Sequence, residues 1–264
     1  MRISVITVVM NDKSGLEKTM NSVWNQTYSE LELIVIDGGS KDGTAEYIGS
    51  VVERLDSAVS EPDGGIYDAM NKGLERAGGD FVLFLNAGDV LAHPGVLFEI
   101  VVDMDEVDAV YFGRAENLSS ADSWYHPPYS HVDSSNVNEW LQSNLPNHQS
   151  MLFPKAFYKN NRYSLRFRIW GDADYKHRAF QECSARFVDT VVTRFQLGGV
   201  SSGLPTLRHA IASSFEGTAL SLKYTAGLRR YLIAARRTLV PFSKFLLRKL
   251  LGRRYWSLLK STRR

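Results

Sequence analysis

The chain has 264 residues, of which 44% are hydrophobic and 23% are charged, with 20 Gly and 8 Pro. This composition is ordinary for a globular enzyme and excludes a mainly disordered, collagen-like or coiled-coil protein. The net charge of +2 hides an asymmetry, because residues 1–216 carry all 29 acids against 18 Lys and Arg, whereas residues 217–264 carry 13 Lys and Arg and no acid.

The first 113 residues alternate strand and helix patterns. Apolar runs predict buried strands over residues 3–10, 31–37, 58–60, 80–86 and 109–113. Helical spacing predicts helices from a capping box at 14–17 to about residue 26, and over 44–55, 66–77 and 94–103. This alternation predicts an α/β fold with a mostly parallel sheet and right-handed crossovers.

The rest of the chain is less regular. Residues 114–150 are rich in Asn, Ser, His, Pro and aromatics and predict irregular structure, while residues 151–200 predict short strands and a helix near 173–182. After Gly203 the pattern is helical and basic to the end.

The cysteine content and the apolar runs indicate in which cellular compartment to expect the protein. The single Cys183 cannot form a disulfide within the chain, so a reducing compartment is the default expectation. Residues 3–10 are too few for the apolar core of a signal peptide, and no run of 18 apolar residues occurs, so we expect no spanning helix. A cytoplasmic location follows as an expectation.

Polar and acidic residues, usually with glycine, follow each of the first four predicted strands. The segments are Thr7 to Asn11, residues 37–44, residues 61–65 and residues 86–89. Ligands in open α/β sheets bind at the carboxyl ends of strands, where Gly allows close approach and Asp can hold a ribose hydroxyl or a divalent cation. The same residue types also build ordinary turns. Their repetition at four strand ends favours a ligand site.

Several segments carry a resemblance to a known family. They are ITVVMN (6–11), VIDGGSKDGT (35–44), SEPDGGIYDAMNKGLERAGGDFVLFLNAGD (60–89), NHQSMLF (147–153), GDADY (171–175) and LGGVSS (197–202). In this order they resemble family 2 inverting glycosyltransferases, and most closely the bacterial exopolysaccharide and colanic-acid-type branch. The resemblance implies a GT-A (Rossmann-like) domain over residues 1–205, with a mixed, mostly parallel sheet flanked by helices. Its donor half would cover about 1–113 and its acceptor half about 114–205, before a helical basic tail at 206–264.

The resemblance also implies a nucleotide-sugar donor, UDP-linked, and a divalent cation, Mg²⁺ or Mn²⁺. Residues 86–89 stand where the family carries an Asp-x-Asp metal motif, and only the final acid, Asp89, remains as the metal ligand. Such a cation would neutralise the leaving diphosphate. The residues that the resemblance assigns to the donor are Thr7, Asn11, Asp37, Gly39, Ser40, Asp63, Asn71 and Asn86.

Transfer with inversion needs a carboxylate that takes the proton of the acceptor hydroxyl. The resemblance places this base in GDADY and favours Asp174, which an aromatic residue follows, over Asp172. Helix capping is the alternative role for either acid. His148 and Gln149 are expected to face the donor sugar or the acceptor, with an ordinary surface histidine as the alternative.

The basic C-terminal segment predicts binding to a membrane surface. Residues 223–264 place an apolar helical face among Arg and Lys, a pattern typical of helices lying on anionic membranes. Docking on the acidic body and nucleic-acid binding are the alternatives. We expect peripheral attachment at the inner face of the cell membrane, a lipid-linked or growing glycan acceptor, and no nucleic-acid partner.

The sequence therefore predicts a hexosyltransferase of surface-polysaccharide synthesis. Two other classes stay open. One is a dinucleotide-dependent Rossmann-type enzyme, although residues 7–15 lack G-x-G-x-x-G. The other is a nucleic-acid-binding protein that uses the basic tail.

Overall fold

The computed structural model describes residues 1–118, 122–129, 131–196, 206–225, 231–240 and 243. The chain divides into two compact units. The first comprises Met1–Leu165 and Tyr175–Leu197, and the second comprises Arg166–Asp174 and the residues from Gly198 onward. The predicted boundary at residue 205 and the donor and acceptor halves stay predictions.

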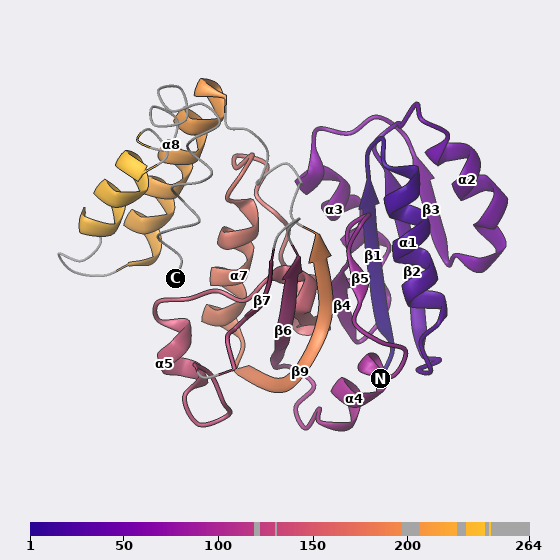
Figure 1. The fold of residues 1–264 in the computed structure, drawn as a ribbon, viewed down its shortest axis with the longest axis horizontal. Helices are drawn as coiled ribbons and strands as arrows, with labels where there is room; N and C mark the ends of the chain where they lie inside the picture. The colour runs from indigo at the N-terminus through magenta and orange to yellow at the C-terminus, as the bar shows by residue number, and fades with distance from the viewer. Residues whose placement is uncertain (119–121, 130, 197–205, 226–230, 241–242, 244–264) are drawn as a thin grey trace. The chain divides into compact units, whose positions relative to one another are not determined.

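Within the described residues, the first unit is built on a nine-stranded sheet (Figure 1). Its N-terminal half is parallel, in the order β3-β2-β1-β4, with β1 (Ile3–Val9), β2 (Leu31–Asp37), β3 (Ser57–Ser60) and β4 (Phe81–Phe84). Every residue of β1 is buried, because helices cover both faces of this central strand. The continuous apolar run at the start of the sequence is therefore a buried parallel strand, as predicted.

The second half of the sheet is mixed. Its strands are β5 (Val90–Leu91), β6 (Val110–Leu118), β7 (Ser123–His126), β8 (Met151–Pro154) and β9 (Ala185–Gln196). β8 is antiparallel to β4 and β6, β9 is parallel to β6 and antiparallel to β5, and β7 is antiparallel to β6. The prediction of irregular structure over 114–150 is wrong for β6 and β7. β6 extends to Leu118 because it also pairs with β9, which lies far along the chain, and β7 carries no apolar run that would mark it. The prediction of short strands beyond 151 misses the full length of β9.

Helices cover both faces of the sheet, which confirms the predicted α/β class. Successive strand residues point to opposite faces, so β1 and β2 contribute to two apolar clusters. One cluster contains residues of α3 (Ile66–Arg76), α5 (Val137–Leu141), α6 (Lys155–Tyr158) and α7 (Gly171–Glu182). The other contains residues of α1 (Lys13–Trp24), α2 (Thr44–Val51) and α4 (Val96–Val102).

The start of α1 differs from the prediction. Its N-cap is Asp12, whose carboxylate accepts the backbone N–H of Gly15 at 2.9 Å, and Ser14 lies inside the first turn. The predicted capping box at 14–17 is wrong, because a charged acceptor at a helix N-terminus outcompetes a hydroxyl two residues on.

Two contacts set the position of α3 against the sheet. Gly73 lies so close to β1 that a Cβ atom there would stand 2.4 Å from Cγ2 of Ile6. Just after α3, the backbone N–H groups of Gly78 and Gly79 donate to the buried carboxylate of Glu32, as does the Ser4 hydroxyl. Burial raises the pKa of Glu32, but the hydrogen bonds outweigh burial and the pKa lies below its ordinary value.

A buried arginine anchors the loop after β7. Arg114 of β6 is 1% exposed, and its Nε donates to Asp189 Oδ1 at 2.7 Å. Its Nη1 and Nη2 donate to the main-chain carbonyls of Pro127 at 2.8 Å and Val132 at 3.4 Å. The guanidinium also lies 4.3 Å from the ring centroid of Tyr129. One side chain thus fixes the described part of residues 127–132 to the sheet.

The second unit is helical where it is described. α8 (Leu207–Tyr224) and a helix over residues 231–240 lie side by side (Figure 1), joined by Ser214 Oγ to the Thr238 carbonyl at 3.1 Å and by the hydroxyls of Thr218 and Thr238 at 2.7 Å. Most of the predicted membrane-binding segment, residues 226–230, 241–242 and 244–264, lies outside the described residues. Among the described helices, none is long and apolar enough to cross a bilayer.

Candidate functional site

The ends of β1, β2 and β3 are joined through Asp37. This carboxylate is fully buried and accepts hydrogen bonds from the Ser40 hydroxyl at 2.5 Å and the Ser60 hydroxyl at 2.6 Å. Ser40 in turn accepts the backbone N–H of Asn11 at 2.7 Å, and Asn11 Oδ1 accepts the N–H of Lys41 at 2.8 Å. The structure therefore brings together Asn11, Asp37 and Ser40, as predicted from the strand ends.

Glycines let the next loop approach this network. A Cβ atom on Gly38 would stand 2.6 Å from Oδ2 of Asp63, and one on Gly39 would stand 3.1 Å from the Pro62 nitrogen. Gly39 also has a φ of +83°, a conformation that side chains disfavour. Asp63 thus lies against the Asp37 loop.

The loop after β4 is held by Thr19, a residue that the sequence did not single out. The buried Thr19 hydroxyl donates to the carbonyl of Asp89 at 2.7 Å and lies 3.2 Å from that of Asn86, and it accepts the N–H of Gly88 at 3.0 Å. Its only sequence signal is a hydroxyl on the apolar face of α1. The N–H of Ala87 bonds to the Val8 carbonyl at 3.1 Å, so the loop continues beside β1.

Asn86, Asp89, His148 and Gln149 form one cluster. Asn86 Nδ2 lies 3.3 Å from His148 Nε2, at the start of the 3-10 turn η2 (His148–Ser150). Asp89 is 4% exposed, and burial raises the pKa of its carboxyl to about 7, although nearby His148 and a hydrogen bond from Gln149 act in the opposite direction. Segments 60 residues apart in sequence therefore build a single polar cluster.

Three buried oxygens at these strand ends have no hydrogen-bond partner within the described part of the chain: Thr7 Oγ1, Asn86 Oδ1 and Asp89 Oδ2. Buried polar atoms are rarely left unsatisfied. At these strand ends the three oxygens are therefore the atoms to test for contact with a ligand. Carboxylate and amide oxygens suit Mg²⁺ or Mn²⁺. The described residues hold no group of three or more His, Cys, Asp or Glu that could bind a metal. The described atoms whose chemistry fits such a cation are the unpartnered Asn86 Oδ1 and Asp89 Oδ2.

Asn71 uses both of its amide atoms within the fold. Its Nδ2 donates to the Tyr163 carbonyl at 3.0 Å, and its Oδ1 accepts the Tyr163 N–H at 2.8 Å. A donor contact for Asn71 stays a prediction.

Asp172 and Asp174 lie in the first turn of α7, inside the helix rather than at its cap, and both belong to the second unit. Asp174 is 2% exposed, and its Oδ1 accepts hydrogen bonds from Lys223 Nζ at 2.9 Å and from the Tyr224 hydroxyl at 2.7 Å. The sequence did not single out these two partners, because nothing local links residue 174 to the end of α8.

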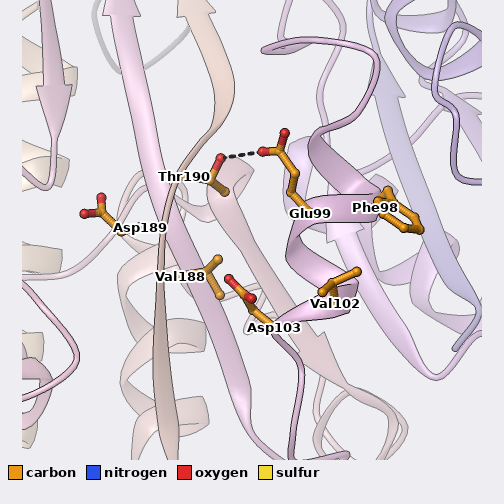
Figure 2. Close-up of a pocket in the computed structure, with 7 residues that line it drawn as sticks. All are labelled: Phe98, Glu99, Val102, Asp103, Val188, Asp189 and Thr190. Carbon is orange, nitrogen blue, oxygen red and sulfur yellow. Dashed lines mark hydrogen bonds between the residues drawn. The ribbon is translucent and has the colours of Figure 1, made fainter.

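A pocket of about 330 Å³ lies elsewhere in the first unit, between α4 and β9 (Figure 2). Phe98, Val102 and Val188 supply its apolar wall, and Glu99 accepts a hydrogen bond from the Thr190 hydroxyl at 3.1 Å. None of the predicted site residues lines it, so the candidate site remains at the strand ends.

Comparison with known proteins identifies the family of this chain. The model of the family described as Glycosyl transferase family 2 matches residues 4–183. A Mycobacterium tuberculosis protein named as an uncharacterized glycosyltransferase is 32% identical over 207 residues, covering 76% of this chain and 77% of its own length. The PGL/p-HBAD biosynthesis glycosyltransferase of Mycobacterium bovis is 27% identical over 209 residues, covering 75% of this chain and 78% of its own.

Solved structures share the fold. S. aureus TarS 1-349 in complex with UDP-GlcNAc superposes with a TM-score of 0.67 at 18% identity, covering 93% of this chain and 73% of TarS 1-349. The mannosyltransferase PcManGT from Pyrobaculum calidifontis, in complex with GDP-Man and Mn²⁺, gives a TM-score of 0.63 at 15% identity, covering 99% of this chain and 79% of its own. These similarities confirm the predicted GT-A-type α/β architecture.

Proposed function

The chain belongs to glycosyl transferase family 2, and from this premise we propose that it is an inverting enzyme that transfers a sugar from a UDP-linked donor to a lipid-linked or growing glycan in bacterial surface-polysaccharide synthesis. Family membership favours the transferase over the dinucleotide-dependent alternative. The observation that carries the proposal is the cluster at the ends of β1 and β4, where buried oxygens of Thr7, Asn86 and Asp89 lack partners among the described residues.

In this proposal the donor nucleoside lies over the loops of Asp37 and Asp63, with Thr7, Asn11, Gly39 and Ser40 around it. The close approach allowed at Gly38 and Gly39 supports this arrangement. UDP-GlcNAc in the complex with TarS supports the UDP-linked class. His148 and Gln149 would face the sugar, because they touch the same cluster as Asn86 and Asp89.

Asp89 and Asn86 would hold a divalent cation, and the Mn²⁺ in the PcManGT complex supports this assignment. When bound, such a cation neutralises charge on the leaving diphosphate. Asp89, whose pKa lies near 7 through burial, contributes its full negative charge only when it is deprotonated.

Asp174 would act as the base. The acceptor oxygen attacks the anomeric carbon, the bond from that carbon to the phosphate oxygen breaks, and the acceptor proton moves to the Asp174 carboxylate as the nucleoside diphosphate leaves. Support comes from the hydrogen bonds of Lys223 and Tyr224 to this carboxylate, because both donors favour its ionised form. Asp172 is the alternative base.

Attachment to an anionic membrane would bring the enzyme to its acceptor. Described α8 exposes an apolar stripe of Leu207, Ile211, Phe215 and Leu222 along one side. The residues from 217 onward carry 13 Lys and Arg and no acid, which complements anionic headgroups.

The test is a thermal-shift panel of UDP-GlcNAc, UDP-glucose, GDP-mannose and NAD, each with and without Mn²⁺. We expect stabilisation by one nucleotide sugar that grows with Mn²⁺, and loss of the Mn²⁺ increment in Asp89→Ala. Asp174→Asn should keep this stabilisation but release nucleoside diphosphate at least about 100-fold more slowly. Stabilisation by NAD alone, or full turnover in Asp174→Asn, would refute the proposal.

A further inference from the structure

The chain segment that leads into α7 is held by α8. Glu216 accepts three backbone N–H groups, from Arg168 through Oε1 and from Ile169 and Trp170 through Oε2, each at 2.9 Å. Gly171, the next residue, is the first residue of α7. These three N–H groups belong to the residues directly before the helix. Glu216, the last acid in the chain, therefore anchors the segment that leads into α7.

Trp170 adds a second attachment within the same unit. Its indole Nε1 donates to the Ser213 hydroxyl at 3.1 Å, and the Arg237 guanidinium lies 4.8 Å from its ring centroid. A Cβ atom on Gly217 would stand 3.4 Å from the indole ring, so the ring lies in close contact with α8. Residues 168–170 are thereby attached to α8 through the indole ring of Trp170 as well as through their backbone N–H groups.

The third attachment reaches Asp174 itself. Lys223 and Tyr224, in the last turn of α8, both bond to Oδ1 of this 2% exposed carboxylate. A buried carboxylate keeps its charge only when donors compensate for lost water. Burial lowers the pKa of Lys223, but its bonds to Tyr224 and Asp174 outweigh burial and the pKa lies above its ordinary value. Two donors on one oxygen also restrict the rotation of the side chain.

We propose that Lys223 and Tyr224 are positioning residues that orient the Asp174 carboxylate and keep it ionised for catalysis. In this proposal Glu216 holds the segment before α7, the helix whose first turn carries Asp174. The inference rests on the proposed function, in which Asp174 is the base. It gives the C-terminal helices a part in the chemistry besides attachment to a surface.

The test measures release of nucleoside diphosphate from the sugar donor that the thermal-shift panel selects, with water as the only acceptor and then with a lipid extract of bacterial membranes. Lys223→Met and Tyr224→Phe should each lower kcat about 10- to 100-fold, within the range of general-base catalysis, and change the donor KM less than about twofold. Lys223→Arg keeps a cation at the carboxylate and should retain most of kcat. Arg208→Met, which removes a cation from the first turn of the same helix, should behave as wild type.

The outcomes separate the two proposals. Loss of turnover in Asp174→Asn with wild-type kcat in both Lys223→Met and Tyr224→Phe would overturn the inference and leave the proposed base in place. Wild-type turnover in Asp174→Asn would overturn the base assignment itself. A raised donor KM at unchanged kcat would instead make Lys223 and Tyr224 donor-binding residues and overturn the inference. Thermal melts of every variant show whether it is folded at the assay temperature. Glu216→Gln, which replaces one of the two accepting oxygens with an NH2 group, should lower kcat about 10-fold, and wild-type kcat in this variant would remove Glu216 from the inference.

Discussion

At the scale of single residues, Thr19 organises the loop that carries Asn86 and Asp89. Its hydroxyl interacts with two carbonyls and one N–H of that loop, although α1 and the loop are about 70 residues apart in the chain. A hydroxyl that is both donor and acceptor suits this position, because neither a carbonyl nor an N–H alone satisfies both kinds of group.

Thr19→Val should destabilise the protein by about 1–3 kcal/mol, because the variant leaves the half-buried N–H of Gly88 and the Asp89 carbonyl without their partner. Urea unfolding measures this loss, and calorimetry with Mn²⁺ and the selected donor should show weaker binding as well. Thr193→Val is the matched control. Its buried hydroxyl has no partner among the described residues, so its removal should be neutral or slightly stabilising. Equal destabilisation by both variants would contradict the assigned role.

At the scale of elements, the approach of α3 to β1 depends on Gly73. The absence of a side chain at this helical position allows Ile6 to reach the helix backbone. Gly49 in α2 has no such packing role, because a Cβ atom there would meet nothing within 4 Å.

These two glycines give opposite predictions for the same substitution. Gly73→Ala should cost about 1–3 kcal/mol through overpacking against Ile6. Gly49→Ala should gain about 0.5–1 kcal/mol, because alanine has the better helix propensity and meets no neighbour. Denaturant unfolding of both variants tests the packing directly, and a stabilising Gly73→Ala would show that α3 lies farther from β1.

The Glu32 contacts predict a pH dependence of stability. The folded pKa of Glu32 lies below its ordinary value, so deprotonated Glu32 stabilises the fold above the unfolded pKa of about 4.3. Its contribution should fall as the pH drops through the lower, folded pKa. Glu32→Gln should therefore be less stable than wild type by about 1–3 kcal/mol at pH 7, with the gap closing in acid. A gap of constant size from pH 7 to pH 3 would contradict this.

The strands in the parallel half of the sheet could be predicted because the local sequence pattern specifies them. Apolar segments predicted β1 to β4. Because the ends of parallel strands share one edge of a sheet, the sequence also placed Asp37, Asn86 and Asp89 at that edge, and their roles stay predictions. The full length of β9 was missed because its partners β5 and β6 lie far away in the chain. β7 pairs with the neighbouring β6 and was missed because it carries no apolar run. Thr19, Glu216, Lys223 and Tyr224 were missed because their hydrogen-bond partners are also distant in the chain, although an isolated last acid before a basic tail was a usable signal.

At the scale of the whole molecule, the chain joins an α/β unit to a helical unit. α7 belongs to both, with Asp174 assigned to the helical unit and Tyr175 to the sheet unit. Tyr175 is fully buried and stacks on Tyr163 with ring centroids 4.1 Å apart. Substitutions in α8 are therefore expected to affect catalysis as well as surface attachment.

Surface attachment predicts that the full chain floats with vesicles containing anionic phosphatidylglycerol and not with neutral phosphatidylcholine, with less binding at high salt. Phe215→Ser should weaken binding about tenfold, because inserting a phenylalanine gains roughly 1.5–3 kcal/mol. Phe98→Ser, which changes another exposed phenylalanine, on α4, is the control and should bind as wild type. Equal binding of wild type and Phe215→Ser would contradict a role for the α8 stripe.

Arg114 has a consequence for how this protein can diversify. It holds the loop after β7 through the carbonyls of Pro127 and Val132, atoms that every residue type supplies. Most side chains between them can then be exchanged over generations without releasing the loop from the sheet. A buried arginine that bonds to main-chain carbonyls therefore allows the side chains of the loop to change while the sheet stays the same.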